Sequence, residues 1–490
     1  MEHTPGKLAS EFVCEAASGR YLREHVARLA EWSASDDPPC SLEATGALFG
    51  GIIEPLADSF EPQAVSTTNR VLAQIIQQCR RMPRGVALDR ELEKLGLMTE
   101  DELFSRAEGL TQTSTPGATD TSRMKRAIVL SRVTLGADVA ITSVIIERLK
   151  QQLPGAEIVL VGGRKTEELF GGDPRLRFPV IGYQRGGSLL DRLTSWLDLL
   201  GCTRDLTEGL ADDEYLIVDP DSRLTQLGLL PVGRSAAAAN YFFFPSRNYG
   251  ANTRHTLSNL AHLWSCELFG SFPEVLPRVT TRSRDRETAT ALFRLLRAGG
   301  KRPVVLVNFG IGDNPKKRVG AEFESSLVIE LIQTGATVIL DKGAGADEAE
   351  RVGRVVDEIR RFEDDGRGMK VAEVDEPRLP ALLGSQSIDA RMLVWQGRIG
   401  LLAAMIGESD LYIGYDSAGQ HIAAALGVPV IDVMAGFISP RMLDRWRPAG
   451  PAEVRVIPVD TIAGTPDAEA VLRAVMNHAR EMLKKDGTKL

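Results

Sequence analysis

Residues 410–440, with the sequence DLYIGYDSAGQHIAAALGVPVIDVMAGFISP, decide the fold. Leu411–Tyr415 is a short apolar run that predicts a buried strand, and residues 416–419 form a turn of polar and small residues. Residues 422–426 predict a helix ended by a glycine, and residues 428–433 predict a second buried strand. Strand, turn, helix and strand make a βαβ unit. Its turn lies at the carboxyl end of the first strand, where open α/β sheets bind ligands.

The turn suits an anionic ligand. Ser417, Ala418 and Gly419 place backbone N–H groups at a helix N-terminus, which is a favourable position for a phosphate or diphosphate. Asp416 repels a bare phosphate, so we expect it to fix the turn or to orient sugar hydroxyls. An ordinary βα turn with a capping serine explains the same residues without a ligand. Both interpretations stay open on these residues alone.

Composition restricts the class of protein. The 490 residues are enough for two or three domains, and the net charge of -8 argues against a protein that binds nucleic acid through a basic face. The 5 cysteines have no metal-ligand spacing, which favours reduced thiols in the cytoplasm. The N-terminal residues lack the features of a signal peptide. No apolar run approaches the roughly 20 residues that span a bilayer, so we expect any membrane association to be peripheral.

Hydrophobic periodicity predicts four segments. Residues 1–110 form a helical N-terminal region, and residues 111–124, rich in Ser, Thr, Gly and Pro, form a linker. Strands then alternate with helices over residues 125–285 and again over residues 286–490, which predicts two doubly wound, Rossmann-like α/β domains with mostly parallel sheets. The closing helix, expected at residues 468–483, is a candidate for packing back on the first α/β domain.

Three motifs occur in one order along the second, third and fourth quarters of the chain. They are RAIVLSRVTLGADVAITSVI (126–145), VVLVNFGIGDNPKKR (304–318) and DLYIGYDSAGQHIAAALGVPVI (410–431). Together they resemble glycosyltransferase family 9, the heptosyltransferase-like proteins, which have the GT-B fold. The sequence departs from the family pattern twice. Ala137 is inserted before Asp138, and Ala418 stands where the family has glycine, with Gly419 one place later.

The resemblance implies an inverting, metal-independent transfer of heptose or a related sugar from a nucleotide-diphosphate donor such as ADP-heptose. The acceptor is then a saccharide, a glycolipid or a protein. The base that takes the proton of the acceptor hydroxyl maps to Asp138, and Gly136 and Ala137 map to the acceptor side. Asp is also a favoured helix cap, so a structural role for Asp138 remains the alternative.

The resemblance places the donor on the second domain. Gly310 and Gly312 form its glycine-rich turn, and Lys316 or Lys317 neutralises charge on the departing diphosphate. Arg318 and His421 are further expected donor contacts, beside Asp416 and residues 417–419. The sequence does not decide which lysine reaches the phosphates.

No carboxylate or Cys/His cluster has metal-ligand spacing, and no GxGxxG, GxxxxGK[ST] or GxSxG motif follows a predicted strand. We therefore expect no cofactor apart from the sugar nucleotide as co-substrate. Two alternatives remain: a non-catalytic nucleotide-sugar-binding or regulatory protein, and a nucleotide-sugar epimerase. The helical region is expected to bind the acceptor, pack on the active site or mediate a homo-oligomer, in the cytoplasm or at the inner membrane face.

Overall fold

The computed structural model describes residues 4–35, 37–112, 121–183, 187–234, 239–251, 253–298, 300, 302–312, 314–343, 345–362 and 370–485. Residues 113–120 of the expected linker therefore lie outside the described residues. The chain divides into two compact units. Unit 1 comprises Met1–Thr166 and Pro174–Val275, and unit 2 comprises Glu167–Asp173 and Leu276–Leu490.

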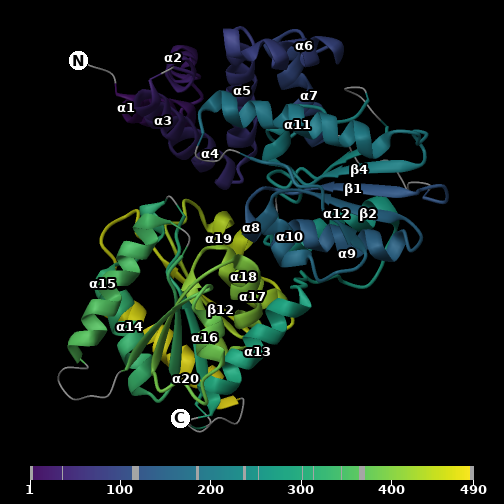
Figure 1. Ribbon diagram of the computed structural model, residues 1–490. Helices are drawn as coiled ribbons and strands as arrows, with labels where there is room; N and C mark the ends of the chain where they lie inside the picture. The colour runs from purple at the N-terminus through teal and green to yellow at the C-terminus, as the bar shows by residue number, and fades with distance from the viewer. Residues whose placement is uncertain are drawn as a thin grey trace. The chain divides into compact units, whose positions relative to one another are not determined.

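Unit 1 begins with the predicted helical region (Figure 1). Prolines stand at the first positions of several of its helices, where the missing N–H costs nothing. Its α-helices are α1 (Pro5–Ala17), α2 (Arg23–Ser33), α3 (Pro38–Gly46), α4 (Glu54–Asp58), α5 (Pro62–Cys79), α6 (Val86–Lys94) and α7 (Glu100–Gln112). A π-helical segment, η1 (Ala47–Ile53), joins α3 to α4, and a 3₁₀ turn, η2 (Pro83–Gly85), precedes α6.

The sheet of unit 1 is parallel, with the strand order β3-β2-β1-β4-β5. Its strands are β1 (Arg126–Leu130), β2 (Glu157–Val161), β3 (Leu176–Arg177), β4 (Tyr215–Asp219) and β5 (Tyr241–Phe243). The alternating pattern of residues 125–285 also predicts a strand near residues 180–181, and this strand was placed wrongly. Val180 forms only an isolated bridge with Gly162, because the strand pairing has already ended at Arg177.

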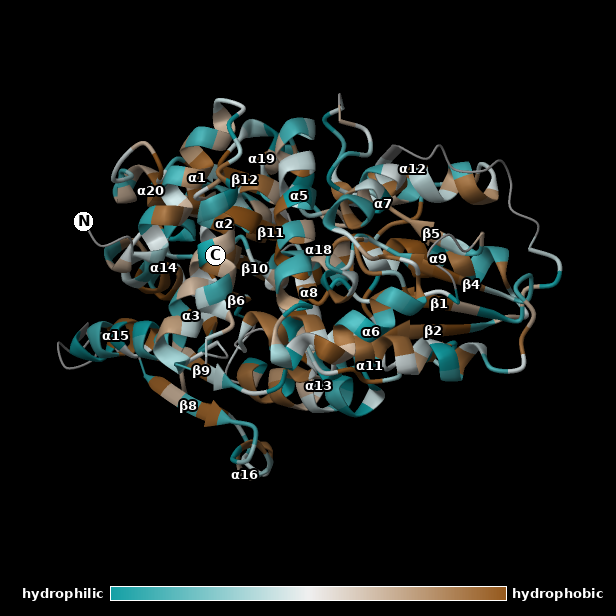
Figure 2. Cartoon of the chain, turned by 90° about the horizontal axis from the view of Figure 1, so that it is seen from above, coloured by the Kyte–Doolittle hydropathy of each residue, from teal (hydrophilic) through white to brown (hydrophobic). Residues whose placement is uncertain are grey.

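Helices cover both faces of this sheet. Helix α11 and the helical region lie on one face, and α9 and α12 lie on the other (Figure 1). The strands β1 and β2 are hydrophobic and buried after their charged first residues, as expected for strands covered on both faces (Figure 2). The helical elements after the linker are α8 (Leu135–Ala137), η3 (Asp138–Thr142), α9 (Ser143–Gln152), α10 (Arg164–Phe170), α11 (Leu189–Thr207), η4 (Arg223–Thr225) and α12 (Leu257–Phe269).

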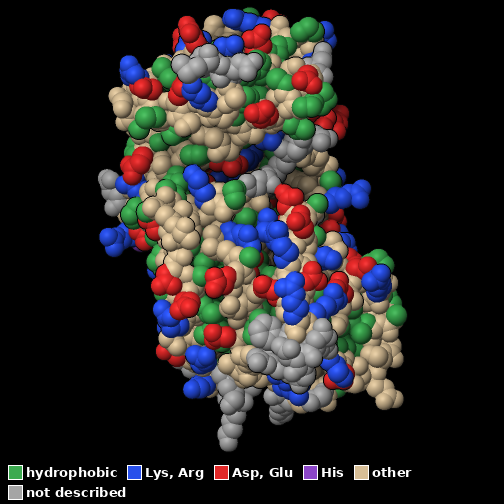
Figure 3. Space-filling model, turned by 90° about the vertical axis from the view of Figure 1, so that its left-hand side faces the viewer, with side chains coloured by type: hydrophobic (Ala, Val, Ile, Leu, Met, Phe, Trp, Pro, Cys, Tyr) green, Lys and Arg blue, Asp and Glu red, His purple; other side chains and the backbone are tan. Residues whose placement is uncertain are grey.

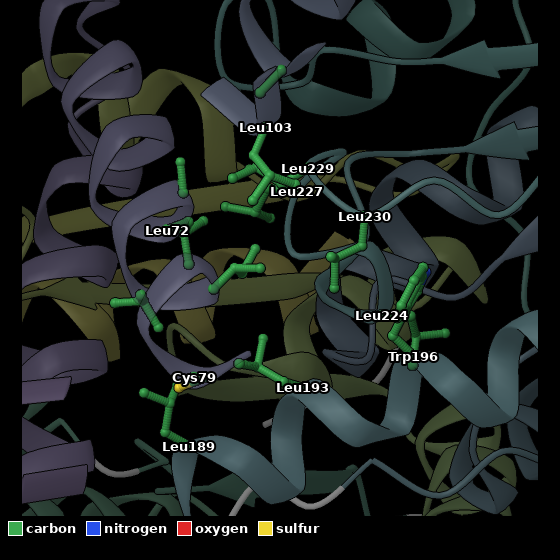
Figure 4. Close-up of a cluster of buried hydrophobic side chains, with 14 of the residues drawn as sticks. Leu72, Cys79, Leu103, Leu189, Leu193, Trp196, Leu224, Leu227, Leu229 and Leu230 are labelled. Atoms are coloured by element: carbon green, nitrogen blue, oxygen red, sulfur yellow. The ribbon is translucent and has the colours of Figure 1, made fainter. Parts of the chain in front are cut away.

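The helical region is not a separate domain of unit 1, because it shares one hydrophobic core with α11 and the sheet. Cys79 of α5 lies beside Leu189 and Leu193 of α11 in Figure 4, and Leu72 of α5 belongs to the same buried cluster. A leucine that is fully buried contributes roughly 2 kcal/mol. Removing the helical region would expose many such side chains of α11, so unit 1 is expected to fold as a whole.

Unit 2 contains a parallel sheet with the strand order β12-β11-β10-β6-β7-β9-β8. Its strands are β6 (Val304–Asn308), β7 (Thr337–Asp341), β8 (Val371–Asp375), β9 (Met392–Gln396), β10 (Leu411–Tyr415), β11 (Val430–Ala435) and β12 (Val454–Val459). The two strands β9 and β12 were not predicted. The opening βαβ unit is confirmed as β10, α18 (Ala418–Ala425) and β11, although its helix begins at Ala418 and not at residue 422.

The other elements of unit 2 complete its two covering layers. Helix α20 packs against α14 and the edge of the sheet at β11 and β12. These elements are α13 (Ser283–Arg297), η5 (Pro315–Lys317), α14 (Ala321–Gln333), α15 (Ala346–Phe362), α16 (Leu379–Leu383), α17 (Ile399–Glu408), α19 (Pro440–Trp446) and α20 (Ala468–Lys485). The α/β architecture of two Rossmann-like units after a helical region is confirmed.

The surface carries charges of both signs, interspersed on the face that Figure 3 shows. Within the described part of the chain, no helix combines the length and the apolar character needed to cross a bilayer.

Candidate functional site

The turn between β10 and α18 in unit 2 holds the residues of the expected diphosphate site. Its shape depends on Tyr412, whose side chain lies under the first turn of α18. A Cβ on Gly419 would lie 1.9 Å from the Tyr412 hydroxyl oxygen, and one on Gly414 would lie 2.8 Å from it. Gly419 is therefore required by close packing against Tyr412. This explains why the sequence has its glycine at this position.

Asp416 is held at the turn by two partners. Its Oδ2 lies 2.5 Å from the Lys317 ammonium, and its Oδ1 accepts a hydrogen bond of 3.0 Å from Gln420 Nε2. Gln420 Oε1 in turn accepts from the Ser417 N–H at 2.8 Å. One of the three backbone donors expected to cradle a phosphate is thus bonded within the turn. The N–H groups of Ala418 and Gly419 lie in the first turn of α18, where a helix supplies no internal acceptor.

The structure distinguishes the two lysines of η5. Lys317 is 21% exposed and reaches Asp416, whereas the Lys316 side chain is exposed. The backbone of this turn is fixed from both sides. Thr461 Oγ1 donates to the Lys316 carbonyl at 2.5 Å, and Gly436, with φ of 69°, lies so close that a Cβ there would meet the same carbonyl oxygen at 2.5 Å. Lys317 is therefore the lysine that lies at the β10–α18 turn.

Arg318 has a structural partner. Its guanidinium forms a two-point ion pair with the buried Glu324, at 2.5 and 2.7 Å, and Tyr415 also donates to Glu324. The pair fixes the start of α14 to the sheet. The structure thus gives Arg318 a role that needs no ligand, and its donor contact stays a prediction.

The glycine-rich turn after β6 is formed around Asn308. Asn308 Oδ1 accepts from the Gly310 N–H at 2.7 Å, and Asn308 Nδ2 donates to Asp341 at 2.5 Å. Gly312 has φ of 57°, a left-handed conformation that favours glycine. Burial raises the pKa of Asp341 to about 6.

His421 lies on the buried side of α18. It is 3% exposed and contacts the Trp446 ring edge-on, with 6.0 Å between ring centroids. Burial lowers its pKa to about 4, so the imidazole is neutral at pH 7. Because the His421 side chain is buried against Trp446, it can contact a donor only if this packing opens.

Sequence reasoning missed a polar residue under the same turn. Asp432 in β11 is fully buried, and neither of its carboxylate oxygens has a hydrogen-bond partner among the described residues. It pairs in register with Gly414 of β10, two residues before Asp416. Burial, together with the charge of Asp416, raises the pKa of Asp432 well above its usual range. An aspartate inside the apolar run VPVIDV was the available signal.

In unit 1, the expected base Asp138 is fully buried at the carboxyl end of β1. Oδ2 accepts from Ser131 Oγ at 2.6 Å and Thr166 Oγ1 at 3.3 Å. Oδ1 accepts from the Arg132 N–H at 2.7 Å and Thr142 Oγ1 at 2.9 Å. Burial raises the pKa of Asp138 and these hydrogen bonds oppose the shift. The carboxylate braces the β1–α8 turn.

The inserted Ala137 lies directly before a π-helical turn that begins at Asp138. A π turn takes one residue more than an α turn, and such turns occur mostly as single bulges inside α-helices, frequently at functional sites. We interpret the bulge as the way in which the insertion is accommodated while α9 keeps its packing. Gly136 and Ala137 both lie in the short helix α8, beside Asp138.

No group of three or more His, Cys, Asp or Glu side chains that could hold a metal ion occurs in the part of the chain that the structure describes. The sequence matches no protein-family model, and it matches no curated protein.

The chain is similar to solved structures of glycosyltransferases. One is a family 9 glycosyltransferase from Veillonella parvula, with 15% sequence identity and a TM-score of 0.53 over 76% of this chain and 100% of that chain. The chain also matches E. coli ADP-heptose LPS heptosyltransferase II (15% identity, TM-score 0.49, 74% of this chain, 100% of that one). A third match is E. coli heptosyltransferase WaaC with ADP (15% identity, TM-score 0.49, 73% and 99%). The first likeness, with the two parallel sheets, shows that the chain has the GT-B fold, as the sequence predicted.

Proposed function

We propose that this protein is an inverting glycosyltransferase that needs no metal ion and transfers a sugar from a nucleotide-diphosphate donor. The observation that carries the proposal is the β10–α18 turn of a GT-B fold, where Lys317 lies beside a helix N-terminus. A cation and a helix N-terminus together stabilise a departing diphosphate. The resemblance of the three sequence motifs to family 9 supports ADP-heptose or a related sugar nucleotide as the donor.

In the proposed reaction, the acceptor hydroxyl oxygen forms a bond to the anomeric carbon while the bond from that carbon to the diphosphate oxygen breaks. Asp138 takes the hydroxyl proton. The negative charge left on the diphosphate is neutralised by Lys317 and the N–H groups of residues 418 and 419. Asp138 must then exchange one of its present hydrogen bonds for the acceptor hydroxyl. We expect this to be the longest one, to Thr166 at 3.3 Å.

Donor binding requires Lys317 to exchange Asp416 for phosphate oxygens. Asp416 keeps Gln420 as its second partner in that state. The exchange predicts that donor binding depends on Lys317 and not on Lys316, because Lys316 takes no part in it.

A thermal-shift panel of ADP-, GDP- and UDP-sugars tests the function, because ligands that bind only the native state raise Tm. We expect one nucleotide class to stabilise the wild-type protein. Lys317→Ala should abolish the shift and the matched control Lys316→Ala should keep it. If no sugar nucleotide shifts Tm, or if both variants behave alike, the proposed donor site is wrong.

A second candidate is a nucleotide-sugar-binding protein without catalysis. The observation that favours it is the complete burial of Asp138, with both oxygens occupied. The two functions differ in turnover: a donor that shifts Tm but is neither transferred nor hydrolysed supports the binding protein. Release of nucleoside diphosphate by the wild type that is lost in Asp138→Asn, at a temperature where the variant is still folded, supports the transferase.

A further inference from the structure

The helical region reaches into the polar interior of unit 1 at Asn69. This residue of α5 is fully buried. Its Nδ2 donates to Glu108 of α7 at 2.9 Å, and its Oδ1 accepts from both terminal nitrogens of Arg247 at 3.4 Å. Arg247 follows β5, so this contact joins the helical region to the loops at the carboxyl end of the sheet.

Arg247 continues the chain of contacts to Asp221, which follows β4. The guanidinium binds both carboxylate oxygens, at 2.9 and 3.0 Å, and Ser246 Oγ donates to the same carboxylate at 2.8 Å. Asp221 is 1% exposed and has φ of 65°, a strained conformation for a residue with a side chain. The surrounding hydrogen bonds hold the residue in this conformation.

Arg132 ends the chain at the expected base. Its Nη1 donates to Ser246 Oγ at 2.6 Å and to the Pro220 carbonyl at 2.5 Å. Its backbone N–H donates to Asp138 Oδ1 at 2.7 Å. Five hydrogen-bonded residues therefore connect α5 to the carboxylate of Asp138.

A second route starts in α4, one helix earlier, and reaches Asp138 through Ser131, the neighbour of Arg132 in the chain. Glu54 of α4 accepts from Arg223 of η4 at 3.0 Å. Ser222, next in the chain to Arg223, donates its hydroxyl to the Ser131 carbonyl at 2.5 Å. Ser131 Oγ donates to Asp138 Oδ2 at 2.6 Å. Each route therefore supplies one of the two donors to one oxygen of Asp138, the first route to Oδ1 and the second to Oδ2.

The shared hydrophobic core already explains why the helical region is attached. It does not explain the buried ions, since a buried ion pair is often no more stable than apolar residues of the same size. Buried polar chains fix one arrangement of the groups that they join. A role in geometry accounts for a chain of this kind better than a role in stability.

We propose that the helical region is a positioning element for the β1–α8 turn, in which the five residues of the first route, Asn69, Arg247, Asp221, Ser246 and Arg132, set the orientation of the Asp138 carboxylate. The assignment of Asp138 as base rests on the proposed function, whereas the positioning of its turn does not. The helical region would then fix the conformation of the β1–α8 turn, where the acceptor binds in the proposed reaction.

The test compares two buried amides of the same helix in the full chain. Asn69→Ala removes the start of the first route. Gln74→Ala is the matched control, because Gln74 is 1% exposed and makes two hydrogen bonds, to Tyr21 and to the Arg23 carbonyl, inside the helical region alone. Amide hydrogen exchange of residues 131–139 is measured in both variants, together with the titration of the Asp138 carboxyl carbon by NMR.

We expect exchange at residues 131–139 to rise about tenfold in Asn69→Ala, with a shifted Asp138 titration, and neither change in Gln74→Ala. The double variant Asn69→Asp with Glu108→Gln reverses the polarity of one contact and keeps an acceptor for Arg247, so it should restore both readouts. Equal effects in the two alanine variants, or none at residues 131–139 in Asn69→Ala, overturn the proposal.

Turnover separates this inference from the proposed function. With a donor that the wild type turns over, Asn69→Ala should lower kcat about tenfold while donor Kd stays unchanged. A wild type with no turnover refutes the transferase and leaves the exchange result to decide the positioning role. A wild type with turnover and an unaltered Asn69→Ala kcat refutes the positioning role alone.

Discussion

The turn after β1 in unit 1 and the turn after β10 in unit 2 both lie at the carboxyl end of an inner strand of a parallel sheet, yet they are stabilised in opposite ways. The first is built around Asp138, a buried carboxylate with four hydrogen-bond donors. The second is built around an exchangeable ion pair, Lys317–Asp416, and close packing at Gly419. Beneath it lies Asp432, a buried carboxyl with no partner among the described residues.

The difference matches the tasks that we propose. A base must be held in one place before the substrate arrives, which a saturated hydrogen-bond network achieves. A diphosphate site must release its internal partner when the ligand binds, which the Lys317–Asp416 pair permits because the diphosphate replaces the negative charge beside Lys317. The comparison teaches that the number of partners of a carboxylate, more than its burial, distinguishes the two turns.

Breaking the first turn should have the largest effect. Asp138→Asn puts an amide donor among four donors, and buried donors without an acceptor cost roughly 1–3 kcal/mol each. We expect the free energy of unfolding to fall by about 4 kcal/mol in urea titrations. The exposed Asp205→Asn of α11 is the control and should change it by less than about 0.5 kcal/mol. Equal stability of Asp138→Asn and wild type would contradict a bracing role.

The second turn should be most sensitive to an increase in side-chain volume at Gly419. Gly419→Ala places a methyl group on the Tyr412 ring and hydroxyl, so we expect a loss of about 3 kcal/mol in the free energy of unfolding. The matched helical glycine is Gly353 of α15, where an added Cβ meets nothing within 4 Å. Gly353→Ala should raise stability by about 0.5–1 kcal/mol. The same sign for both variants would show that Tyr412 does not occupy the space under α18.

Acid should weaken the second turn through His421. Its pKa is lowered to about 4, so the unfolded chain, with an ordinary pKa near 6.5, takes up the proton first as the pH falls. This contribution to stability is complete above pH 6.5 and is lost progressively down to pH 4. Between pH 7 and pH 5 the loss is about 2 kcal/mol. His421→Gln should show a smaller decrease over this interval; an identical decrease would place the titrating group elsewhere.

Alkali should have the smaller effect, through Asp432. A carboxyl whose pKa is raised in the native state contributes stability that is complete below the pKa of the unfolded chain. This contribution is lost as the pH rises through the native pKa. Asp432→Asn removes that loss. We expect the variant to equal the wild type near pH 4 and to exceed it by about 1 kcal/mol at pH 8, measured by urea unfolding. A variant that is less stable at pH 8 would show that the ionised carboxyl has a partner.

Much of the fold follows from local pattern. The strands 126–130, 304–308 and 411–415 are continuous apolar runs bounded by turns, so their burial was readable. The strand β12 was missed because Pro458 and the polar residues of its edge position interrupt the run. The helix after the β10 turn was expected too late, since Gly419 weakens the helical pattern where packing against Tyr412 requires it.

The site was predictable as a set of residues and not as a set of contacts. Residues 416–419 and the lysines of η5 are adjacent to strand ends, and the sequence marks those ends. The choice of Lys317 depends on Gly436 and Thr461, which fix the turn from more than 100 residues away. The five-residue route from Asn69 to Asp138 joins segments that share no local signal, so only the tertiary structure reveals it.

Cys79 gives the shared core of unit 1 a chemical consequence. It is the buried one of the free cysteines, and burial raises its thiol pKa to about 12, so almost no reactive thiolate exists at pH 8. The thiol lies between α5 and α11, as Figure 4 shows, and becomes reactive only when these helices separate. The rate at which Cys79 is alkylated therefore reports, without any added label, how often the helical region separates from the rest of unit 1. If that rate equals the rate of global unfolding, the two fold and unfold together.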